Sequence, residues 1–349
     1  MKLLVLYEEL AGYFLACINA FVEKENAEVL IIHKETNTVA PFQFAPLKSV
    51  RTLDRSKIDE KDLNNLVLEF SPDVIFCAGW GFKSYLKICR KFQINIPVIL
   101  GFDNWWIGSM KQRLSIKFAK FFFSKRFNRC FVPASHQKEF ALRLGFSESR
   151  IASGAYCCDF IQFNNYFKEN TASKKTSFPK RFIFVGRYAT EKGIVILWNA
   201  FLEIQKESPN EWELWCLGKG DLKAIEHPKI KHFGFVQPSE MKSLIQQTGV
   251  FILPSLFEPW GVVAHEFAAA GFPLILSNQV GAAEFFLRDN QNGFTIKHGD
   301  SESLKIAMKS MIGMNDEKLF EMAENSNRLA SCITPQKWSE TLYELISAR

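Results

Sequence analysis

Short apolar runs alternate with longer amphipathic stretches through the first half of this chain. The apolar runs cover residues 2–8, 28–33, 73–79, 97–102 and 129–134, and amphipathic stretches lie between several of them at 10–24, 81–92, 108–127 and 135–144. Short runs that are apolar throughout are typical of buried strands, whereas the longer stretches repeat apolar positions with the period of a helix. Alternating strands and helices predict a mostly parallel sheet that is covered by helices on both faces.

The same alternation starts again in the second half. Strands are expected at 181–186, 212–218, 231–235, 249–254 and 272–277, and helices at 191–206, 238–247 and 261–271. Between the halves, a polar stretch rich in Ser, Thr, Asn and Lys ends at a proline, which is typical of a linker. We therefore predict two doubly wound domains at 1–165 and 181–334, a linker at 166–180, and an amphipathic last helix at 335–349. Such sheets bind ligands at the carboxyl ends of their strands, so we expect the domains to face a central cleft.

Composition narrows the class of protein. At 349 residues, with 47% hydrophobic and 23% charged residues, the chain has the size and composition of a globular protein of two domains. No apolar run reaches the roughly 18 residues that cross a bilayer. The eight cysteines form no CxxC pair, and no HExxH or Asp-x-Asp occurs, so the sequence predicts no metal site.

A strand-to-helix loop carries two cations. Arg187 and Lys192 lie in VGRYATEKG, which follows an expected strand and precedes a strongly amphipathic helix. Two cations at this edge of a sheet would neutralise a diphosphate, and an arginine would do so through two parallel hydrogen bonds. Taken alone, the segment is explained as simply by a solvated basic loop with Gly186 at its turn.

Two carboxylates accompany the start of another helix. In FILPSLFEPWGVVAHEFAAAG, residues 251–271, Pro259 and Gly261 indicate that a helix begins near residues 260–262. Glu258 then lies in the loop, and Glu266 lies within the first two helical turns. Helix N-termini attract anions, and carboxylates accept hydrogen bonds from sugar or ribose hydroxyls. One glutamate would be explained by the helix dipole, but the pair favours a site for a nucleotide-sugar.

Five motifs in a fixed order carry a family resemblance. They are FVGRYATEKG, LWCLGKGDL, KHFGFV, the long stretch from FILPSLFEPW to GAAEFF, and NGFTI, all between residues 181 and 300. Together they resemble the nucleotide-binding half of glycosyltransferase family 4. The resemblance implies an α/β protein of the GT-B fold, with two Rossmann-like domains, the donor held by the second domain and the acceptor by the first. It also implies that the last helix, 335–349, packs back on the first domain.

The resemblance also implies roles for individual residues. Arg187 and Lys192 would hold the donor diphosphate, Glu258 would contact the donor sugar, and Glu266 would bind the ribose. The remaining donor contacts would come from the loop glycines Gly186 and Gly218, from Phe235 and Val236 beside the base, and from the backbone of Gly261, Val262 and Val263.

The first domain departs from the family pattern at two places. Gly12 matches one position of a Gly-Gly loop after the first strand, but Ala11 occupies the other. Gly12 would approach the donor phosphate or simply form the entry of a helix. Asp103 stands where the family often has a histidine. It would accept a hydrogen bond from a donor hydroxyl or guide the acceptor, as a candidate catalytic residue, or it would cap the following helix.

Excess positive charge lies in the first domain. The net charge of +6 arises within the first 165 residues, and ten basic side chains fall between residues 104 and 150 against two acidic ones. Arg113, Lys117 and Lys120 share one face of an expected helix that also holds Phe118, Phe121 and Phe122. Such a helix lies on an anionic membrane or, alternatively, packs its phenylalanines into the core and leaves a solvated basic face.

The resemblance implies transfer of a sugar from a nucleoside-diphosphate donor with retention of configuration, without a metal or cofactor. The acceptor would be a saccharide or lipid-linked saccharide in the synthesis of cell-surface polysaccharide or lipopolysaccharide. We expect a cytoplasmic protein at the inner face of the cytoplasmic membrane, and no nucleic-acid partner. A nucleotide-sugar epimerase or hydrolase, and a non-catalytic nucleotide-sugar-binding protein, remain alternatives.

Overall fold

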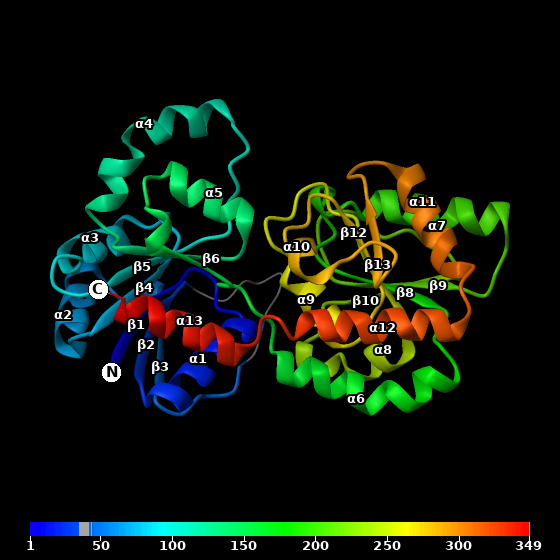
Figure 1. The fold of residues 1–349 in the computed structure, drawn as a ribbon, viewed down its shortest axis with the longest axis horizontal. Helices are drawn as coiled ribbons and strands as arrows, with labels where there is room; N and C mark the ends of the chain where they lie inside the picture. The colour runs from blue at the N-terminus through cyan, green and yellow to red at the C-terminus, as the bar shows by residue number, and fades with distance from the viewer. Residues whose placement is uncertain (35–41, 43, 349) are drawn as a thin grey trace. The chain divides into compact units, whose positions relative to one another are not determined.

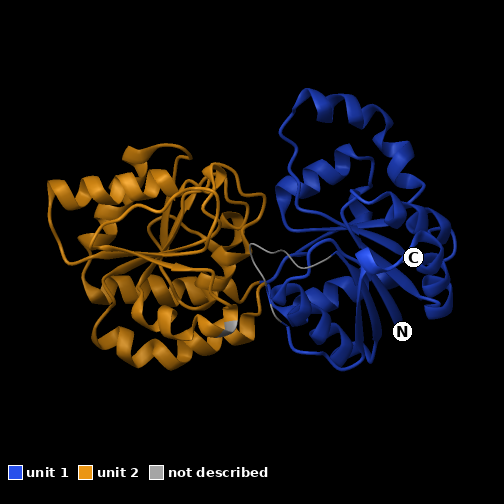
Figure 2. Cartoon of the chain, turned by 180° about the vertical axis from the view of Figure 1, so that it is seen from behind, with its two compact units in different colours: residues 1–157, 333–349 blue, residues 158–332 orange. Residues whose placement is uncertain are grey.

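The computed structural model describes residues 1–34, 42 and 44–348 of the chain. The chain forms two compact units, one of residues Met1–Cys157 with Ile333–Arg349 and the other of residues Cys158–Cys332 (Figure 2). Each unit has one parallel sheet with helices against it (Figure 1). Two Rossmann-like α/β units are thus present.

The first unit is built on a seven-stranded sheet in the order β3-β2-β1-β4-β5-β6-β7. Its strands are β1 (Lys2–Leu6), β2 (Glu28–His33), β3 (Val50–Asp54), β4 (Val74–Ala78), β5 (Val98–Gly101), β6 (Arg129–Val132) and β7 (Ile151–Ser153). Its helices are α1 (Gly12–Glu25), α2 (Glu60–Phe70), α3 (Lys83–Phe92), α4 (Met110–Ser124), α5 (Ser135–Arg143) and α13 (Pro335–Ser347). The central strands β1, β4 and β5 are almost entirely apolar and buried, as expected for strands that are covered on both faces.

The last helix of the chain, α13, belongs to the first unit and packs on α1. Trp338 is buried there, and its indole N–H donates to the Ala155 carbonyl at 2.8 Å. The guanidinium of Arg129 donates to carbonyls at the C-terminus of α13, including that of Ile346 at 2.8 Å. The last carbonyls of a helix have no partner within the helix, and a cation at this end also interacts favourably with the helix dipole.

The second unit has a six-stranded sheet in the order β10-β9-β8-β11-β12-β13. Its strands are β8 (Arg181–Val185), β9 (Glu213–Leu217), β10 (Ile230–Gly234), β11 (Val250–Leu253), β12 (Leu274–Ser277) and β13 (Gly293–Ile296). Its helices are α6 (Phe160–Thr176), α7 (Ile194–Glu207), α8 (Lys242–Gln247), α9 (Val262–Ala269), α10 (Ala283–Phe286), α11 (Ser301–Ile312) and α12 (Asp316–Ala330).

The predicted linker at 166–180 is wrong for most of its length, because α6 extends to Thr176. Asp159 caps this helix by accepting from the Gln162 N–H at 3.1 Å, and Phe163 is buried inside the second unit. The helix packs on α9 and α12. Its polar residues cover the solvent face. Because they are numerous, the apolar residues that face the core are hard to recognise in the sequence.

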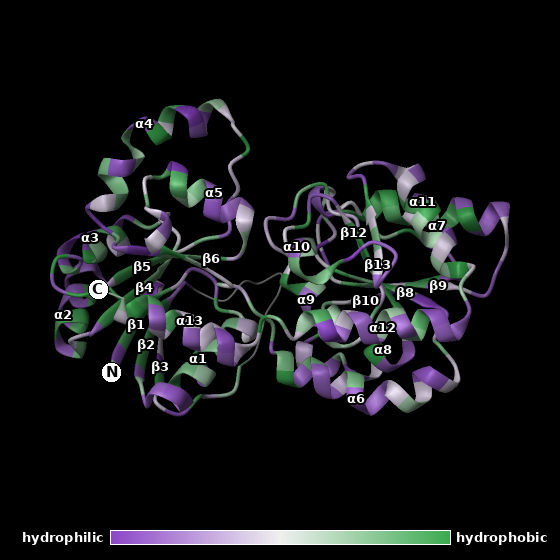
Figure 3. Cartoon of the chain, in the orientation of Figure 1, coloured by the Kyte–Doolittle hydropathy of each residue, from purple (hydrophilic) through white to green (hydrophobic). Residues whose placement is uncertain are grey.

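No helix among the described residues is long and apolar enough to cross a membrane. The strands of both sheets are rich in hydrophobic residues, whereas several surface helices carry mostly hydrophilic ones (Figure 3).

Candidate active site

In the second unit, two strands at the centre of the sheet bring the predicted cation and carboxylate loops together. β8 and β11 are neighbours, and the strand order reverses between them, which is where doubly wound sheets bind ligands. The loop after β8 carries Lys192 and the loop after β11 carries Glu258. The Nζ of Lys192 forms an ion pair with the Oε2 of Glu258, and the two side chains are 18% and 13% exposed. The backbone N–H of Leu256 donates to the Glu191 carbonyl at 2.8 Å and ties the two loops together.

Arg187 lies on the same loop as Lys192 but is more open to solvent. Its Nη2 is 3.0 Å from the Oε1 of Glu191, and both side chains are about half exposed. Exposed pairs of this kind contribute roughly 0–1 kcal/mol, so Glu191 holds the Arg187 guanidinium only weakly. The neighbouring Tyr188 is buried, and its hydroxyl is 2.8 Å from the Nδ1 of His232, which anchors the loop to the sheet.

The predicted glycines of the donor loops lie against each other. Gly218, after β9, has a φ of +131°, and a Cβ there would lie 1.9 Å from the carbonyl oxygen of Gly186, after β8. No side chain fits at this position, so the two loops approach at backbone distance. Phe235 and Val236 follow β10, which is at the edge of the sheet beyond β9, and both are partly buried.

The helix that follows Glu258 begins where the sequence predicts. Gly261 has a φ of +87° and precedes α9, so Val262 and Val263 are its first residues. The first N–H groups of a helix have no carbonyl partner within it and attract an anion. Glu258 is held by the next loop, because its N–H donates to the Gln279 carbonyl at 2.9 Å and its carbonyl accepts from the Gly281 N–H at 3.0 Å.

Glu266 lies on α9 and is partly buried. Burial raises the pKa of its carboxyl to about 7, and the negative charge of Asp159 raises the pKa further in the same direction. Among the described residues, no hydrogen bond to this carboxylate is found, so its oxygens are available to a ligand. The neighbouring His265 is fully buried and has a structural role: its Nδ1 accepts from the Cys158 N–H at 3.1 Å, and burial lowers its pKa to about 4.

The raised pKa of Glu266 gives a testable pH dependence. If the carboxylate accepts from ribose hydroxyls, binding requires the deprotonated form, which falls to about a tenth of the population one pH unit below the pKa. Affinity for a nucleoside diphosphate is therefore expected to increase about tenfold from pH 6 to pH 8, measured by calorimetry. The Glu266→Gln variant is the control, because it removes this titration and leaves only that of the phosphate. An equal pH dependence in the wild-type and Glu266→Gln proteins would contradict the role of Glu266. A second variant, Glu266→Ala, is expected to bind the nucleoside diphosphate more weakly at all pH values.

In the first unit, Asp103 does not cap a helix. The N-cap of α4 is Ser109, which accepts from the Gln112 N–H at 3.3 Å, so the capping interpretation of Asp103 is wrong. Asp103 instead lines a cavity of about 470 Å³ after β5. Gly12 is the first residue of α1, and a Cβ there would make only an ordinary contact with Phe44 at 3.7 Å. The entry of α1 therefore does not require glycine on steric grounds, and this contact does not decide between the two interpretations of Gly12.

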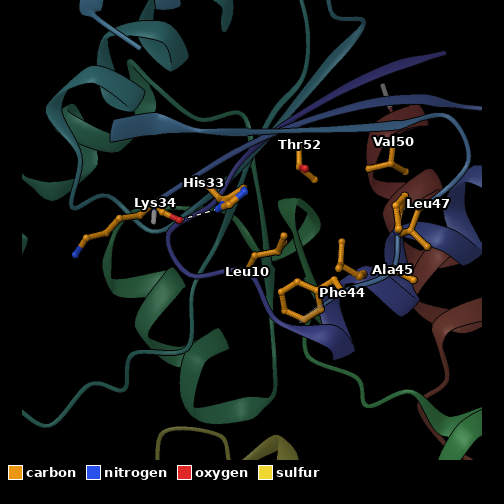
Figure 4. A pocket seen from close by; sticks show the side chains of 10 residues that line it. Leu10, His33, Lys34, Phe44, Ala45, Leu47, Val50 and Thr52 are labelled. Atoms are coloured by element: carbon orange, nitrogen blue, oxygen red, sulfur yellow. Dashed lines mark hydrogen bonds between the residues drawn. The ribbon is translucent and has the colours of Figure 1, made fainter. Parts of the chain in front are cut away.

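The same cavity holds residues that the sequence did not single out. Glu8 and Glu9, which follow β1, line it together with Tyr13 and Tyr156. Their position near the ends of strands in a doubly wound sheet could have marked them in the sequence as candidate site residues. A second cavity, of about 250 Å³, lies beside it near His33, Phe44 and Thr52 (Figure 4). In that cavity, His33 bonds the carbonyl of its neighbour Lys34, whose side chain extends away from the other residues.

The basic helix predicted at 108–129 is α4, residues Met110–Ser124, and its phenylalanines divide between core and solvent. Phe123 is buried, but Phe118 and Phe121 are 76% and 67% exposed. The interpretation in which Phe118 and Phe121 form core is therefore wrong. Arg113, Lys117 and Lys120 are exposed on the same helix, and Arg113 donates from Nε to the Gly108 carbonyl at 2.8 Å.

Within the described residues, no group of three or more His, Cys, Asp or Glu side chains is placed to hold a metal ion.

Part of the second unit resembles a known family in sequence. Residues 179–313 match the sequence pattern of the family described as Glycosyl transferases group 1. An uncharacterised glycosyltransferase of Methanocaldococcus jannaschii is 30% identical over 135 residues, which cover 36% of this chain and 34% of that protein. The lipopolysaccharide core biosynthesis glycosyltransferase LpsE of Rhizobium meliloti is 25% identical over 140 residues, covering 38% and 39%. The matches to these two relatives thus span 34% and 39% of the relatives' own length.

The similarity in fold to solved structures covers both units of the chain. The structure of HepE from Anabaena in complex with UDP superimposes with a TM-score of 0.74 at 15% identity, covering 100% of each chain. At this identity the likeness concerns the fold alone. It confirms the predicted GT-B fold class, in which two Rossmann-like domains are joined in one chain.

Proposed function

We propose that this protein is a glycosyltransferase that takes a sugar from a nucleoside-diphosphate donor bound at the β8–β11 loops. The observation that carries the proposal is the convergence of Lys192, Glu258 and the N-terminus of α9 where the strand order of the second unit reverses. Cations and helix N–H groups fit a diphosphate, and carboxylates fit hydroxyls. The family match of residues 179–313 covers these loops.

In the proposed reaction, the diphosphate is the leaving group, and its developing charge is what the site must stabilise. Arg187 and Lys192 supply two positive charges, and the α9 N–H groups supply fixed dipoles. Binding of the diphosphate would draw Lys192 away from Glu258 and leave that carboxylate to the donor sugar. Phe235 and Val236 would pack on the base. Retention of configuration, and a role of Asp103 beside the donor or acceptor hydroxyl, are part of this proposal.

The proposed acceptor is a saccharide or lipid-linked saccharide used to build a cell-surface polysaccharide or lipopolysaccharide. The likeness to a lipopolysaccharide core glycosyltransferase supports this choice. A panel of UDP-, GDP- and ADP-sugars, followed by calorimetry and product analysis, tests the proposal. An epimerase would return an altered nucleotide-sugar, a hydrolase would release free sugar without an acceptor, and a binding protein would retain the donor unchanged.

We further propose that α4 binds an anionic membrane surface, at the inner face of the cytoplasmic membrane. Met110, Leu114, Phe118 and Phe121 follow the spacing i, i+4, i+8 and i+11, so they share one face, and each is between 58% and 76% exposed. This face lies opposite the buried Ala119. Figure 3 shows hydrophobic and hydrophilic residues alternating along the helix.

Basic side chains flank the exposed apolar face of α4. Lys111 lies on one side of it and Arg113 and Lys117 on the other, and among the described residues none of the three forms an ion pair. Apolar residues would enter the acyl boundary while the cations meet lipid phosphates, with about 1 kcal/mol from each basic residue near the surface. The inner leaflet carries the anionic lipid that this charge pattern favours.

Replacing the two exposed aromatic residues tests the membrane contact. Phe118→Ser/Phe121→Ser is expected to reduce co-sedimentation with vesicles of phosphatidylglycerol and phosphatidylcholine about tenfold or more, because each ring contributes roughly 1.5 kcal/mol or more when buried. Ile94→Ser is the matched control, because Ile94 is 81% exposed elsewhere on the first unit. Arg113→Gln/Lys117→Gln/Lys120→Gln is expected to remove the dependence on anionic lipid. Equal binding by all these proteins would contradict the contact.

A further inference from the structure

The cavity of the first unit lies where its strand order reverses. Its walls come from the loops that follow β1, β4 and β5, and β1 and β4 are the two strands between which the order changes direction. This is the position at which doubly wound sheets bind small molecules, and a volume of about 470 Å³ is within the usual range of such sites. Gly79 forms part of the wall with a φ of +80°, and a Cβ there would meet no atom within 4 Å. The wall is therefore open beside this glycine.

The charges around this cavity are all negative. Glu8 and Glu9 are exposed after β1, and Asp103 is partly buried after β5. Among the described residues that line it, there is no lysine, arginine or histidine. The β8–β11 loops differ in the sign of their charge, because Arg187 and Lys192 lie there. A phosphate or carboxylate placed in this cavity would meet two or three like charges, and no counter-charge among the described residues that line it.

The polar groups that remain suit uncharged hydroxyls. The rings of Tyr13 and Tyr156 lie 6.0 Å apart, and Tyr7 is buried behind them. Burial raises the pKa of Tyr7 and Tyr156 well above the ordinary value, and the charge of Asp103 raises both further. These phenols therefore stay neutral and both donate and accept hydrogen bonds. Their ring faces are apolar, as the C–H faces of a sugar require.

We infer that this cavity binds the acceptor sugar and selects a residue without an anionic substituent, either neutral or bearing an amine. The inference rests on the proposed glycosyl transfer and adds the chemical class of the acceptor. Glu8 and Glu9 are the specificity-determining residues, because they repel phosphorylated sugars and uronic acids. An ammonium group on the sugar would pair with them.

Four methyl glucoside derivatives that differ at one substituent provide the test. The probes are methyl glucoside, its 2-amino analogue, its 6-phosphate and its 6-carboxylate, titrated by NMR into the full chain with a nucleoside diphosphate present. The neutral and amino probes are expected to bind about tenfold or more tightly than the two anionic probes at low salt. This ratio is expected to shrink as salt is raised, because the cavity is open to solvent.

Two double variants separate the charge effect from general damage. Glu8→Gln/Glu9→Gln is expected to reduce the ratio severalfold, whereas Glu23→Gln/Glu69→Gln, which neutralises two carboxylates on helices of the same unit, is expected to leave it unchanged. Equal or tighter binding of the anionic probes, an unchanged ratio in the Glu8/Glu9 variant, or no binding of any probe would each overturn the inference. Binding of the nucleoside diphosphate is recorded in the same titrations, so its absence counts against the proposed function rather than against the acceptor class.

Discussion

Arg187→Ala and Lys192→Ala are each expected to lower kcat/KM for glycosyl transfer at least about a hundredfold. Both cations act on charge that develops on the leaving diphosphate, and removing one such stabilising group typically costs about 3–4 kcal/mol in the transition state. The two variants should differ in stability. Arg187 pairs with an exposed carboxylate, so its loss should change the free energy of unfolding by less than about 1 kcal/mol. Loss of Lys192 leaves Glu258 largely buried without its cation, at a cost of roughly 1–3 kcal/mol.

Steady-state kinetics and thermal unfolding on the same preparations test this result. Arg328→Ala and Lys206→Ala are the controls, because both side chains are exposed on other helices of the second unit. Lys192→Ala/Glu258→Gln is expected to recover much of the stability that Lys192→Ala loses, while its activity stays low. Near-normal turnover in both single variants would contradict the proposed mechanism.

Lys174→Met is expected to stabilise the second unit by roughly 2–4 kcal/mol at pH 7. Lys174 is 3% exposed on α6, and among the described residues its Nζ finds no hydrogen-bond partner. Burial lowers its pKa to about 7 from an ordinary 10.5. The ammonium lies 3.7 Å from the centre of the Phe272 ring, but such a contact returns only about 1–2 kcal/mol. The desolvation penalty is the larger effect, at about 1.4 kcal/mol for each unit of pKa.

The pH dependence of unfolding gives the same claim a second readout. Between about pH 7 and pH 10.5 the unfolded chain binds a proton at Lys174 that the folded chain has lost, so stability from this group rises with pH. Lys174→Met removes that contribution. Lys175→Met is the matched control, because its neighbour Lys175 is exposed on the same helix. A Lys174→Met protein no more stable than the control would show that Lys174 is not desolvated.

The sequence predicted the elements that are mostly buried. β11 is apolar at every position, β1 and β8 are apolar after a charged first residue, and their signal does not depend on where the chain folds back. The loops of the second unit were also predictable, because Gly261 and the charges around it mark the start of α9. Elements with one polar face were harder to predict from the sequence. β3 is largely exposed, and α6 carries its apolar residues among many polar ones, so neither stood out from loop or linker.

The first unit shows what periodicity could not decide. The spacing of α4 predicts a helix, but only the packing of Ala119 and Phe123 reveals that Phe118 and Phe121 face solvent. Similarly, Asp103 precedes a helix by several residues, and the choice between capping and another role depended on where that helix begins. The cavity at β1 and β5 joins residues that are about 150 positions apart in the sequence, from Tyr7 to Tyr156, and no local motif connects them.

Product analysis of the full chain with nucleotide-sugars tests the central claim most directly. The protein is incubated with UDP-, GDP- and ADP-sugars and a panel of saccharide acceptors, and nucleoside diphosphate and glycoside are quantified by mass spectrometry. The account predicts that one donor yields nucleoside diphosphate and glycosylated acceptor in equal amounts, and that Arg187→Ala slows the formation of both at least about a hundredfold. Release of free sugar, an altered nucleotide-sugar, or no reaction with a donor that binds would contradict glycosyl transfer at the β8–β11 loops.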